Sequence, residues 1–477
     1  MEACIVWFRS DLRLAENYAL NAGLTTGSAV VPVYIMDEAD QENQPAGKTA
    51  HGWLRRSLES LDVSLRNIGS RLIFRSGPPL ESLLEVAGET GARAAVWNRR
   101  YDPYGVRQDA ELEQAMRAQG LYTQIFNSAL LLEPWEIKTS NGEPYKVFTP
   151  FHKALIGSYH HRAPMSAPKS LPNPDVWPHS VSIHKLFSNS GGNYASGIED
   201  LWTPGESGAQ SRLMWFVEHA LNLYPERHDR VDLEGTSRLS PHLHFGEISP
   251  KQVWHTVMEA VEQDGSIENS ALAYLRQLIW REFAYNHLYH YPYILEKPFR
   301  EEFEAFPWVS DQPSLDAWRS GMTGYPMVDA GMRQLLNTGW MHNRARLITS
   351  SFLTKDLLIP WQEGARWFIE RLVDADLANN TFGWQWTAGS GADAAPYFRV
   401  FNPVLQGEKF DPDGDYVRKW VPELAELPAE WIHKPWQAPE PVLDSAAIEL
   451  GRDYPRPIID HAFARQRALE AYKAGRR

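Results

Sequence analysis

Cysteine is almost absent from this chain of 477 residues, in which Cys4 is the only one. A single thiol excludes a disulfide within the chain and any site built from four thiolates, including iron–sulfur clusters and Cys4-type zinc sites. We therefore expect no metal or iron–sulfur cluster. This cysteine usage is typical of a reducing compartment and predicts a cytoplasmic location.

Long apolar runs and the commonest enzyme motifs are also missing. No stretch approaches the ~18 apolar residues that span a bilayer, and the first ten residues do not resemble a secretory signal, so we expect no membrane partner. The absence of Walker A, HExxH, nucleophile-elbow and GxGxxG patterns argues against common phosphate-binding, zinc-peptidase and hydrolase classes.

Basic residues are fewer than acidic ones, at 47 against 60, which gives a net charge of −13. Such a charge disfavours general contact with DNA, so a nucleic-acid partner must meet a local basic patch. One candidate runs from Ala330 to Lys355, which contains Arg333, Arg344 and Arg346 but no acid. A solvated basic face is the simplest interpretation, and phosphate contact is favoured only if aromatic side chains lie nearby.

Short β-rich runs alternate with helical patterns over the first 130 or so residues. This alternation predicts an open, Rossmann-like parallel sheet with a ligand crevice at its strand ends. The expected strands are Cys4–Phe8, Ala29–Met36, Arg71–Arg75, Ala94–Trp97 and Leu121–Phe126.

The rest of the chain divides into a connector and a helical domain. We expect an α/β domain over 1–132, a long surface connector over 133–208 that is rich in Pro, Ser, His, Asn and Gly, and an all-α domain over 209–477. Amphipathic spacing predicts helices at Ser211–Leu223, Pro250–Val261, Ser270–Tyr289, Met341–Leu358 and Ala446–Tyr472.

Two polar segments are candidates for ligand binding. The run Gly235–Pro241 carries three hydroxyls before an apolar helical pattern, and it can either cap a helix or hold a phosphate. The run Asp374–Trp386 combines two acids, three side-chain amides and two indoles, and its poor helix formers predict at least partly irregular structure. Paired acids could serve hydrolysis or metal binding, but only a large heteroaromatic cofactor also explains the adjacent indoles.

Several long motifs resemble the photolyase and cryptochrome family. They are Val6–Arg13, Gly235–Pro241, Leu278–Phe283, Gly324–Pro326 with Asp329, Gly339–Arg344, and Asp374–Trp386 continuing to Phe401–Pro403. The resemblance implies an α/β antenna domain, a long connector and a helical domain that holds FAD in a bent conformation. It also implies light-driven repair of pyrimidine dimers in UV-damaged DNA.

The resemblance carries flavin contacts onto specific residues of this chain. They are Tyr224, Thr236, Ser237, Arg238, Leu239, Ser240, Gln277, Arg281, Asn343, Asp374, Asp376 and Asn380. Asn380 would face flavin N5, where plant cryptochromes carry an acid. Because an amide cannot supply a carboxylic proton there, Asn380 favours the repair branch.

The same resemblance assigns an electron path and a lesion pocket. Trp308, Trp361 and Trp384 match the family's chain of three indoles between the surface and the flavin, although packing could explain each indole separately. Trp280 and Trp386 resemble the walls of the lesion pocket. The candidate lesion or phosphate contacts are Asn343, Arg344, Arg399 and Gln406.

Two residues depart from the best-known bacterial cyclobutane-dimer class. Gln277 stands where that class has Glu, and Leu347 where it has Met. Gln277 also resembles (6-4) photolyases, but those relatives usually have paired His where this chain reads His342-Asn343. We therefore favour a cyclobutane-dimer photolyase of a less common bacterial subclass such as class III, with Gln277 among its catalytic residues.

An accessory chromophore is expected in the first domain, in the crevice near Met36, Asp37, Glu38, Arg99 and Tyr101. We expect 5,10-methenyltetrahydrofolate, with 8-hydroxy-5-deazaflavin as the alternative. The rival functions are a cryptochrome-type blue-light receptor, a (6-4) photolyase and a dark flavin oxidoreductase, the last without a nicotinamide fingerprint. We expect a monomer.

Overall fold

Five parallel strands form the only sheet within residues 3–25, 29–37, 39–40, 47–188, 201–397 and 399–474, which the computed structural model describes. The strands are β1 (Ala3–Phe8), β2 (Ala29–Met36), β3 (Ile73–Ser76), β4 (Ala94–Asn98) and β5 (Tyr122–Phe126), in the order β3-β2-β1-β4-β5. β1, β2 and β4 are buried along their whole length, as expected for strands covered on both faces. The predicted parallel sheet is confirmed.

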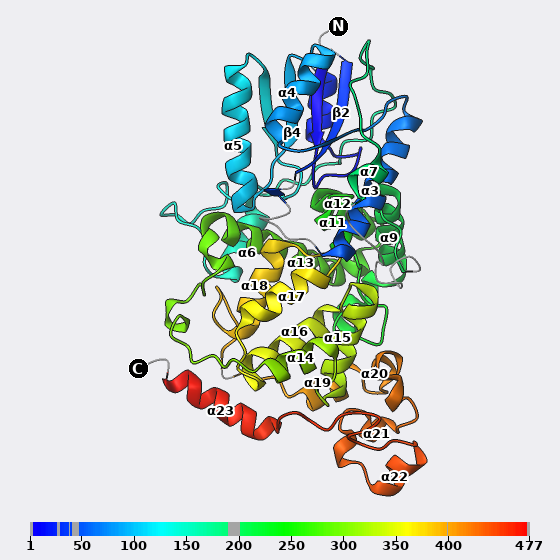
Figure 1. The fold of residues 1–477 in the computed structure, drawn as a ribbon, viewed down its shortest axis with the longest axis vertical. Coiled ribbons are helices and arrows are strands. Elements are labelled where there is room, and N and C mark those ends of the chain that lie inside the picture. Colours follow the sequence, from blue (N-terminus) through cyan, green and yellow to red (C-terminus); the bar gives the residue numbers. More distant parts are fainter. Residues whose placement is uncertain are drawn as a thin grey trace.

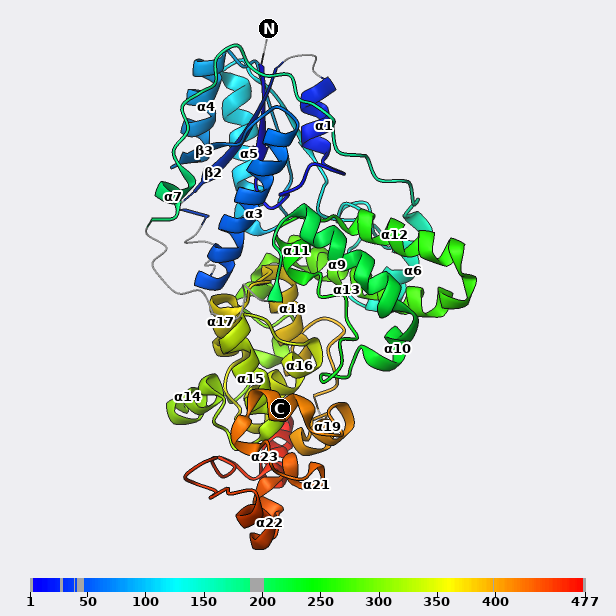
Figure 2. The same cartoon turned by 90° about the vertical axis from the view of Figure 1, so that its right-hand side faces the viewer.

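Helices cover both faces of this sheet (Figures 1 and 2). Val6 and Phe8 pack in one core with Trp53 of α3 (Lys48–Asn67), and that core also includes α1 (Tyr18–Thr25). The alternate residues Ile5 and Trp7 pack in a second core with α4 (Pro79–Thr90) and α5 (Pro103–Ala118). Successive strand residues point to opposite faces, so one apolar strand supplies two cores. We call the sheet and these helices the sheet lobe.

The segment expected as a surface connector is more ordered than its composition predicts. It contains α6 (Phe148–Ser158) and the short α7 (Ile183–Leu186). Phe148, Phe151 and Leu155 of α6 are buried in a core of the helical part of the chain. The prediction failed here because these three residues have helical spacing, which the surrounding Pro, Ser and Asn residues obscure.

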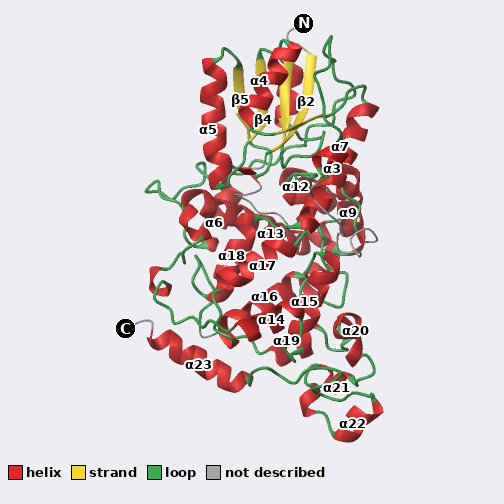
Figure 3. Cartoon of the chain, viewed as in Figure 1, coloured by secondary structure: helices red, strands yellow, loops and turns green. Residues whose placement is uncertain are grey.

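The remainder of the described chain is helical, and all the strands lie in the sheet lobe (Figure 3). We call α9–α23 the helical lobe. Its helices are α9 (Glu206–His219), α10 (Tyr224–Arg227), α11 (Ser240–His244), α12 (Pro250–Gln263), α13 (Glu268–His290), α14 (Gln312–Ser320), α15 (Pro326–Thr338), α16 (Asn343–Ser351), α17 (Trp361–Arg371), α18 (Leu377–Ala388), α19 (Pro403–Phe410), α20 (Asp415–Trp420), α21 (Ala429–Ile432), α22 (Glu440–Ser445) and α23 (His461–Ala474). A π-helical turn, Phe352–Asp356, continues α16.

Two helix predictions need correction. The run Asp374–Trp386, which we expected to be partly irregular, is irregular only at Asp374–Asp376. The rest is helical because Asp376 caps α18 by accepting a hydrogen bond from the Asn379 backbone nitrogen. The helix expected over Ala446–Tyr472 is confined to α23, since residues 446–460 form turns and an isolated bridge.

Buried polar contacts fix the two lobes to each other. Glu247, which follows α11, accepts hydrogen bonds from Trp53 Nε1 at 2.9 Å and from the Gly205 backbone nitrogen at 2.7 Å. Gly246 has a φ of +65°, and a Cβ there would lie 2.1 Å from the Ser10 carbonyl oxygen. The loop after α11 therefore needs glycine to approach the sheet lobe this closely.

Candidate functional site

A cavity of about 380 Å³ lies in the helical lobe between α10, α11, α13, α16, α17 and α18. This volume is within the range of ~300–1,000 Å³ that cofactor pockets usually have. All twelve residues predicted to contact the flavin line it, together with Trp280 and Trp384. The structure thus brings together side chains separated by up to 156 positions in the sequence, from Tyr224 to Asn380.

One end of the cavity is formed by the turn from Thr236 to Ser240. Arg212 supports this turn by donating to the carbonyl oxygens of Thr236 and Ser237, at 3.0 and 2.9 Å. Arg238 has a φ of +52°, an uncommon conformation that recurs at ligand-binding turns. No hydroxyl of the turn caps α11, and the hydroxyl residues line the cavity instead. Of the two interpretations, ligand binding fits this geometry better than capping.

The segment before α18 supplies two carboxylates with different partners. Asp374 pairs with Arg346, whose Nη2 lies 2.7 and 2.9 Å from its two oxygens. Asp376 accepts from the hydroxyl of Tyr285 and lies 4.0 Å from His244 Nδ1. Burial raises the pKa of the Asp376 carboxyl, but the interaction with His244, the charge of Arg281 and the hydrogen bond from Tyr285 together lower this pKa more. The carboxylate therefore stays ionised.

The α13 side of the cavity carries Gln277, Trp280 and Arg281. Gln277 is exposed, whereas Arg281 is buried and donates to the Ala129 carbonyl oxygen at 2.8 Å. The Trp280 ring stacks on Phe148 of α6, with centroids 3.5 Å apart and an interplanar angle of 4°. Helix α6, which lies in the segment expected as a connector, thus covers one face of the Trp280 indole.

The α16 wall starts at His342, which caps the helix by accepting a hydrogen bond from the Arg344 backbone nitrogen at 3.1 Å. Burial lowers the pKa of His342 to about 3, so its ring is neutral and can accept this bond. Ala345 and Ile348 of α16 are fully buried, as the amphipathic spacing over Met341–Leu358 predicts for one face of this helix. Asn343 and Leu347, one turn apart, line the cavity.

The three indoles of the predicted electron path differ in burial. Trp384 lines the cavity and is 2% exposed, and Trp361 is equally buried at the start of α17. Trp308 is half-buried and packs against the same core. Trp308 is thus the most exposed of the three indoles, and Trp384 is the one that lines the cavity.

Four predicted lesion contacts do not line the cavity. Trp386 is half-buried on α18, Arg399 is exposed, and Gln406 lies on α19. Arg344 forms an ion pair with Asp229. Their assignment to the lesion stays a prediction.

Several lining residues were missed by the sequence analysis. Arg346, Trp340 and Asn379 lie within or beside the quoted motifs, so their position was a usable signal. His228 and His244 carried none. The missed residues are His228, Leu243, His244, Tyr274, Leu278, Trp340, Met341, Arg346, Leu347, Ser350, Phe368, Leu372, Asn379, Gly383 and Thr387.

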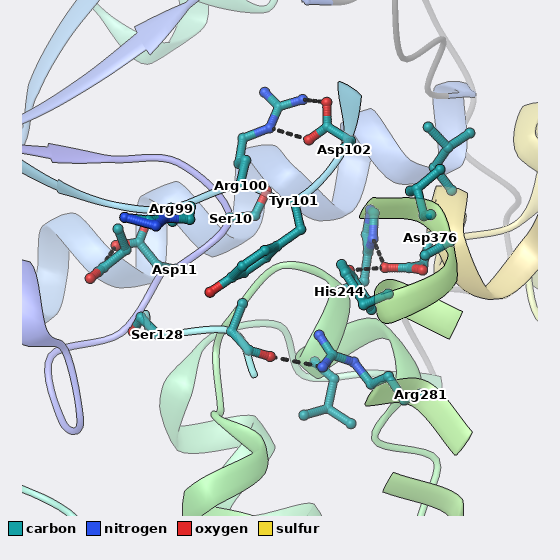
Figure 4. Close-up of a pocket in the computed structure, with 17 residues that line it drawn as sticks. Ser10, Asp11, Arg99, Arg100, Tyr101, Asp102, Ser128, His244, Arg281 and Asp376 are labelled. Carbon is teal, nitrogen blue, oxygen red and sulfur yellow. Dashed lines mark hydrogen bonds and ion pairs between the residues drawn. The ribbon is translucent and has the colours of Figure 1, made fainter. Parts of the chain in front are cut away.

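A smaller polar cavity of about 70 Å³ lies between the lobes (Figure 4). Figure 4 shows Arg100 and Tyr101 of the sheet lobe across from His244, Arg281 and Asp376 of the helical lobe. Arg281 and Asp376 line both this cavity and the larger one. Polar side chains thus connect the inner end of the candidate site with the lobe interface.

The predicted antenna residues are divided between two places. Met36 and Asp37 line a cavity of about 120 Å³ beyond the ends of β1 and β2. Arg99 and Tyr101 instead line the small interlobe cavity, where the Tyr101 hydroxyl donates to Glu133 at 2.7 Å. Glu38 lies outside the described residues.

Within the described ranges, no group of three or more His, Cys, Asp or Glu side chains is placed to hold a metal ion. No helix in those ranges has both the length and the apolarity that crossing a membrane requires.

The fold and the cavity define a two-lobed protein with a cofactor-sized site in its helical lobe. Comparison with known families gives two matches: "DNA photolyase" over residues 4–170 and "FAD binding domain of DNA photolyase" over residues 274–474. The second match lies on the helices that form most of the cavity, so the cofactor of this site is FAD.

Individual relatives match nearly the whole chain. It is 49% identical to the deoxyribodipyrimidine photo-lyase of Agrobacterium fabrum, over 98% of this chain and 97% of that protein. It is 39% identical to cryptochrome-1 of Arabidopsis thaliana, over 98% of this chain and 70% of that protein. A crystal structure of a class III photolyase from Agrobacterium tumefaciens superposes with a TM-score of 0.95 at 48% identity, covering 100% of this chain and 98% of the other. The chain belongs to the photolyase and cryptochrome family, as its motifs indicated.

Proposed function

We propose that this protein is a deoxyribodipyrimidine photo-lyase that uses light to split cyclobutane pyrimidine dimers in UV-damaged DNA. The observation that carries the proposal is the single cavity lined by all twelve predicted flavin contacts. The 49% identity to a deoxyribodipyrimidine photo-lyase over nearly the whole chain supports the same activity.

The residues of the cavity suit a bent dinucleotide. Hydroxyls and backbone amides of Thr236–Ser240 suit the phosphate groups, and Tyr224 lies beside them. The carboxylates of Asp374 and Asp376 suit donors of the isoalloxazine and sugar. Arg346 pairs with Asp374 at 2.9 Å, and the charge of Arg281 helps to keep Asp376 ionised. Asn380 donates to the Ala365 carbonyl oxygen at 3.0 Å, which leaves its amide oxygen to face flavin N5.

Reduced FAD held by these residues would supply light-driven one-electron chemistry, in which the electron given to the lesion returns once the ring bonds have split, so no net oxidation would occur. The chain's own indoles serve a different step, the recovery of reduced cofactor. When the bound cofactor is oxidised, an electron passes from the surface to the cavity through Trp308, then Trp361, then Trp384. Indole is readily oxidised, and short steps between rings make such a path effective.

A dimer stacked in duplex DNA cannot reach a cavity inside the helical lobe, so the lesion must swing out of the helix. A cyclobutane dimer pairs and stacks badly, and its extrusion costs less than that of normal bases. Trp280 and Trp386 form walls for the extruded lesion, and Asn343, Arg344, Arg399 and Gln406 contact the lesion or its phosphates. Trp280 is already held in place by Phe148.

Gln277 is an exposed residue of the cavity lining, and its proposed role toward the lesion is that of a neutral hydrogen-bonding residue. Its amide can donate to a thymine carbonyl, but it provides neither an acidic proton nor a negative charge. The superposition on a class III photolyase supports placement in that subclass.

The test is repair of defined lesions by the holoprotein. The reduced protein is illuminated with an oligonucleotide that carries either a cyclobutane dimer or a (6-4) product, and restoration of pyrimidines is followed by chromatography. We expect restoration of the cyclobutane dimer alone. Repair of the (6-4) product alone would assign the protein to that branch, and repair of neither would favour a receptor of the cryptochrome type, for which the identity to cryptochrome-1 is the supporting observation.

The sheet lobe, residues 1–132 in our division, is proposed to hold the antenna, with 133–208 as the connector and 209–477 as the catalytic domain. Asp37 accepts hydrogen bonds from Gln108 and Tyr104 at 2.8 and 3.0 Å at the strand ends, which favours a polar heterocycle. We propose 5,10-methenyltetrahydrofolate over 8-hydroxy-5-deazaflavin. Mass spectrometry of the extracted chromophore distinguishes them. We further propose a metal-free monomer that acts in the bacterial cytoplasm.

A further inference from the structure

An ion pair beside the flavin cavity holds one of the proposed phosphate contacts. Arg344 on α16 binds Asp229 through two contacts, Nε to Oδ1 at 3.2 Å and Nη2 to Oδ2 at 2.5 Å. Its guanidinium also lies over the Phe410 ring, 4.4 Å from the centroid. The side chains are 18% and 27% exposed, so the pair is accessible from solvent.

The position of this pair places it at the rim of the cavity. Asn343 and His228, the chain neighbours of Arg344 and Asp229, both line the cavity. On α19, the exposed Lys409 has its amine 5.0 Å from the centroid of the same Phe410 ring. Across the described part of the chain, no carboxylate lies within ion-pair distance of Lys409. Two cations thus flank one aromatic ring, and Asp229 neutralises only one of them.

We propose that Asp229 is a positioning residue that makes DNA binding selective for the lesion, an inference that rests on the repair function proposed above. Asp229 occupies the face of the Arg344 guanidinium that would bind a phosphate, because carboxylate and phosphate use the same two-bond geometry. The two side chains are partly exposed, so solvent screens their attraction, and a phosphate brought close to the pair can displace the carboxylate.

Only DNA with an extruded lesion brings a phosphate this close to the rim. Undamaged duplex inserts nothing into the cavity, so its backbone stays farther out and Arg344 remains bound to Asp229. Without the charge of Asp229, Arg344 is free to turn outward and bind any phosphate. Asp229 therefore suppresses contact with undamaged DNA and leaves lesion binding almost unchanged.

The experiment compares wild type with Asp229→Asn in the dark, using duplexes with and without one cyclobutane dimer, between about 50 and 200 mM salt. For Asp229→Asn we expect tighter binding of undamaged duplex, with a logarithmic salt slope steeper by about 0.9, as one added phosphate contact predicts. Affinity for the damaged duplex should stay near that of wild type, so discrimination falls. Asp229→Glu keeps the charge and should restore discrimination.

Two further variants test the route through Arg344. Arg344→Gln should make the slope for damaged duplex shallower by about 0.9, and Asp229→Asn should have no further effect in that background. Glu113→Gln removes an acid from an exposed ion pair with Arg117 on α5, far from the cavity, and controls for net charge.

The inference is overturned if Asp229→Asn leaves the salt slope for undamaged duplex unchanged. It is also overturned if Asp229→Asn still tightens binding of undamaged duplex when Arg344→Gln is present. Flavin content and the urea midpoint of each variant show whether it is folded. Repair by illuminated wild type is measured in the same preparations. Absence of repair contradicts the proposed function, whereas repair with undiminished discrimination in Asp229→Asn contradicts only the role of Asp229.

Discussion

Trp384 joins the cavity to the core of the helical lobe. Its ring meets Phe368 and Trp318 edge-on, with centroids 5.0 and 6.0 Å apart. Its Nε1 is buried and has no hydrogen-bond acceptor among the described residues. The ring is thus held by packing alone, in contact with the proposed flavin site.

Replacement of Trp384 by Phe should abolish photoreduction of oxidised FAD, because phenyl is much harder to oxidise than indole. Repair by chemically pre-reduced protein should remain largely intact. Absorbance of the flavin under blue light and repair assays measure the two steps. Trp318→Phe is the matched control, since Trp318 is buried beside Trp384 but lies outside the proposed path. Equal loss of both activities in Trp384→Phe would refute the assignment.

At the scale of elements, α17 and α18 approach closely through Gly364. A Cβ at this position would lie 2.0 Å from the Trp384 ring, so the ring occupies the space above the glycine. The packing of these two helices therefore fixes where Trp384 lies.

Gly364→Ala should force the indole or the helix to shift, at a cost of about 1–3 kcal/mol in unfolding free energy. Photoreduction should slow because the ring leaves its position in the path. Urea unfolding and flash photoreduction measure the two effects. Gly88→Ala in α4 is the control, since a Cβ there meets no atom within 4 Å and alanine favours a helix. Unchanged stability and photoreduction in Gly364→Ala would contradict this packing.

Helix α13 is anchored to the segment after the sheet by Glu282, which accepts from the Leu131 backbone nitrogen at 2.9 Å. Burial raises the pKa of the Glu282 carboxyl to about 7, although the charge of Arg281 opposes the shift. Because the folded state binds this proton more tightly than the unfolded state, Glu282 favours folding at low pH. That contribution is lost as the pH rises from about 4.5 to about 7.

Glu282→Gln keeps an acceptor for Leu131 but removes the titration. The unfolding free energy of wild type, measured relative to this variant, should therefore fall by about 3 kcal/mol between pH 4.5 and 7. Urea unfolding of the holoproteins across this range provides the measurement. A difference that is constant with pH, or that rises with it, contradicts the buried titration.

For the whole molecule, Arg13 joins three segments that are distant in sequence. Its guanidinium donates to the carbonyl oxygens of Gly246, Ser128 and Glu16 at 2.7, 2.7 and 2.9 Å, and the residue is 1% exposed. Gly246 belongs to the helical lobe, whereas Glu16 precedes α1 in the sheet lobe. Arg13 is thus one of the buried groups that dock the lobes, together with Glu247 and Trp53.

Arg13→Met should leave these three carbonyl oxygens without their buried donor and lower the unfolding free energy by at least about 3 kcal/mol. Flavin retention should fall too, because Arg281 at the lobe interface lines the cavity. Calorimetry and flavin release during gel filtration measure both. Arg66→Met is the control: its side chain is 61% exposed in a surface pair with Asp62, and it should change stability by no more than about 0.5 kcal/mol. A similar effect of both variants would contradict the role of Arg13.

The sequence alone determined the local elements, because their signals lie within a few residues of each other. The alternation of β-rich and helical runs predicted the five strands, and the amphipathic spacing over Met341–Leu358 predicted α16. The family resemblance also predicted twelve residues as flavin contacts. Each of the twelve lines the cavity, and their contact with the flavin stays a prediction.

Tertiary structure decided what depends on partners far along the chain. α18 is helical despite its poor helix formers, since Asp376 caps it and packing covers it. Nothing in the sequence indicates that Arg344 pairs with Asp229. Nothing in it indicates that Phe148 stacks on Trp280 either. Such contacts arise only when the lobes and helices dock, because burial and charge pairing act between surfaces that the linear order does not reveal.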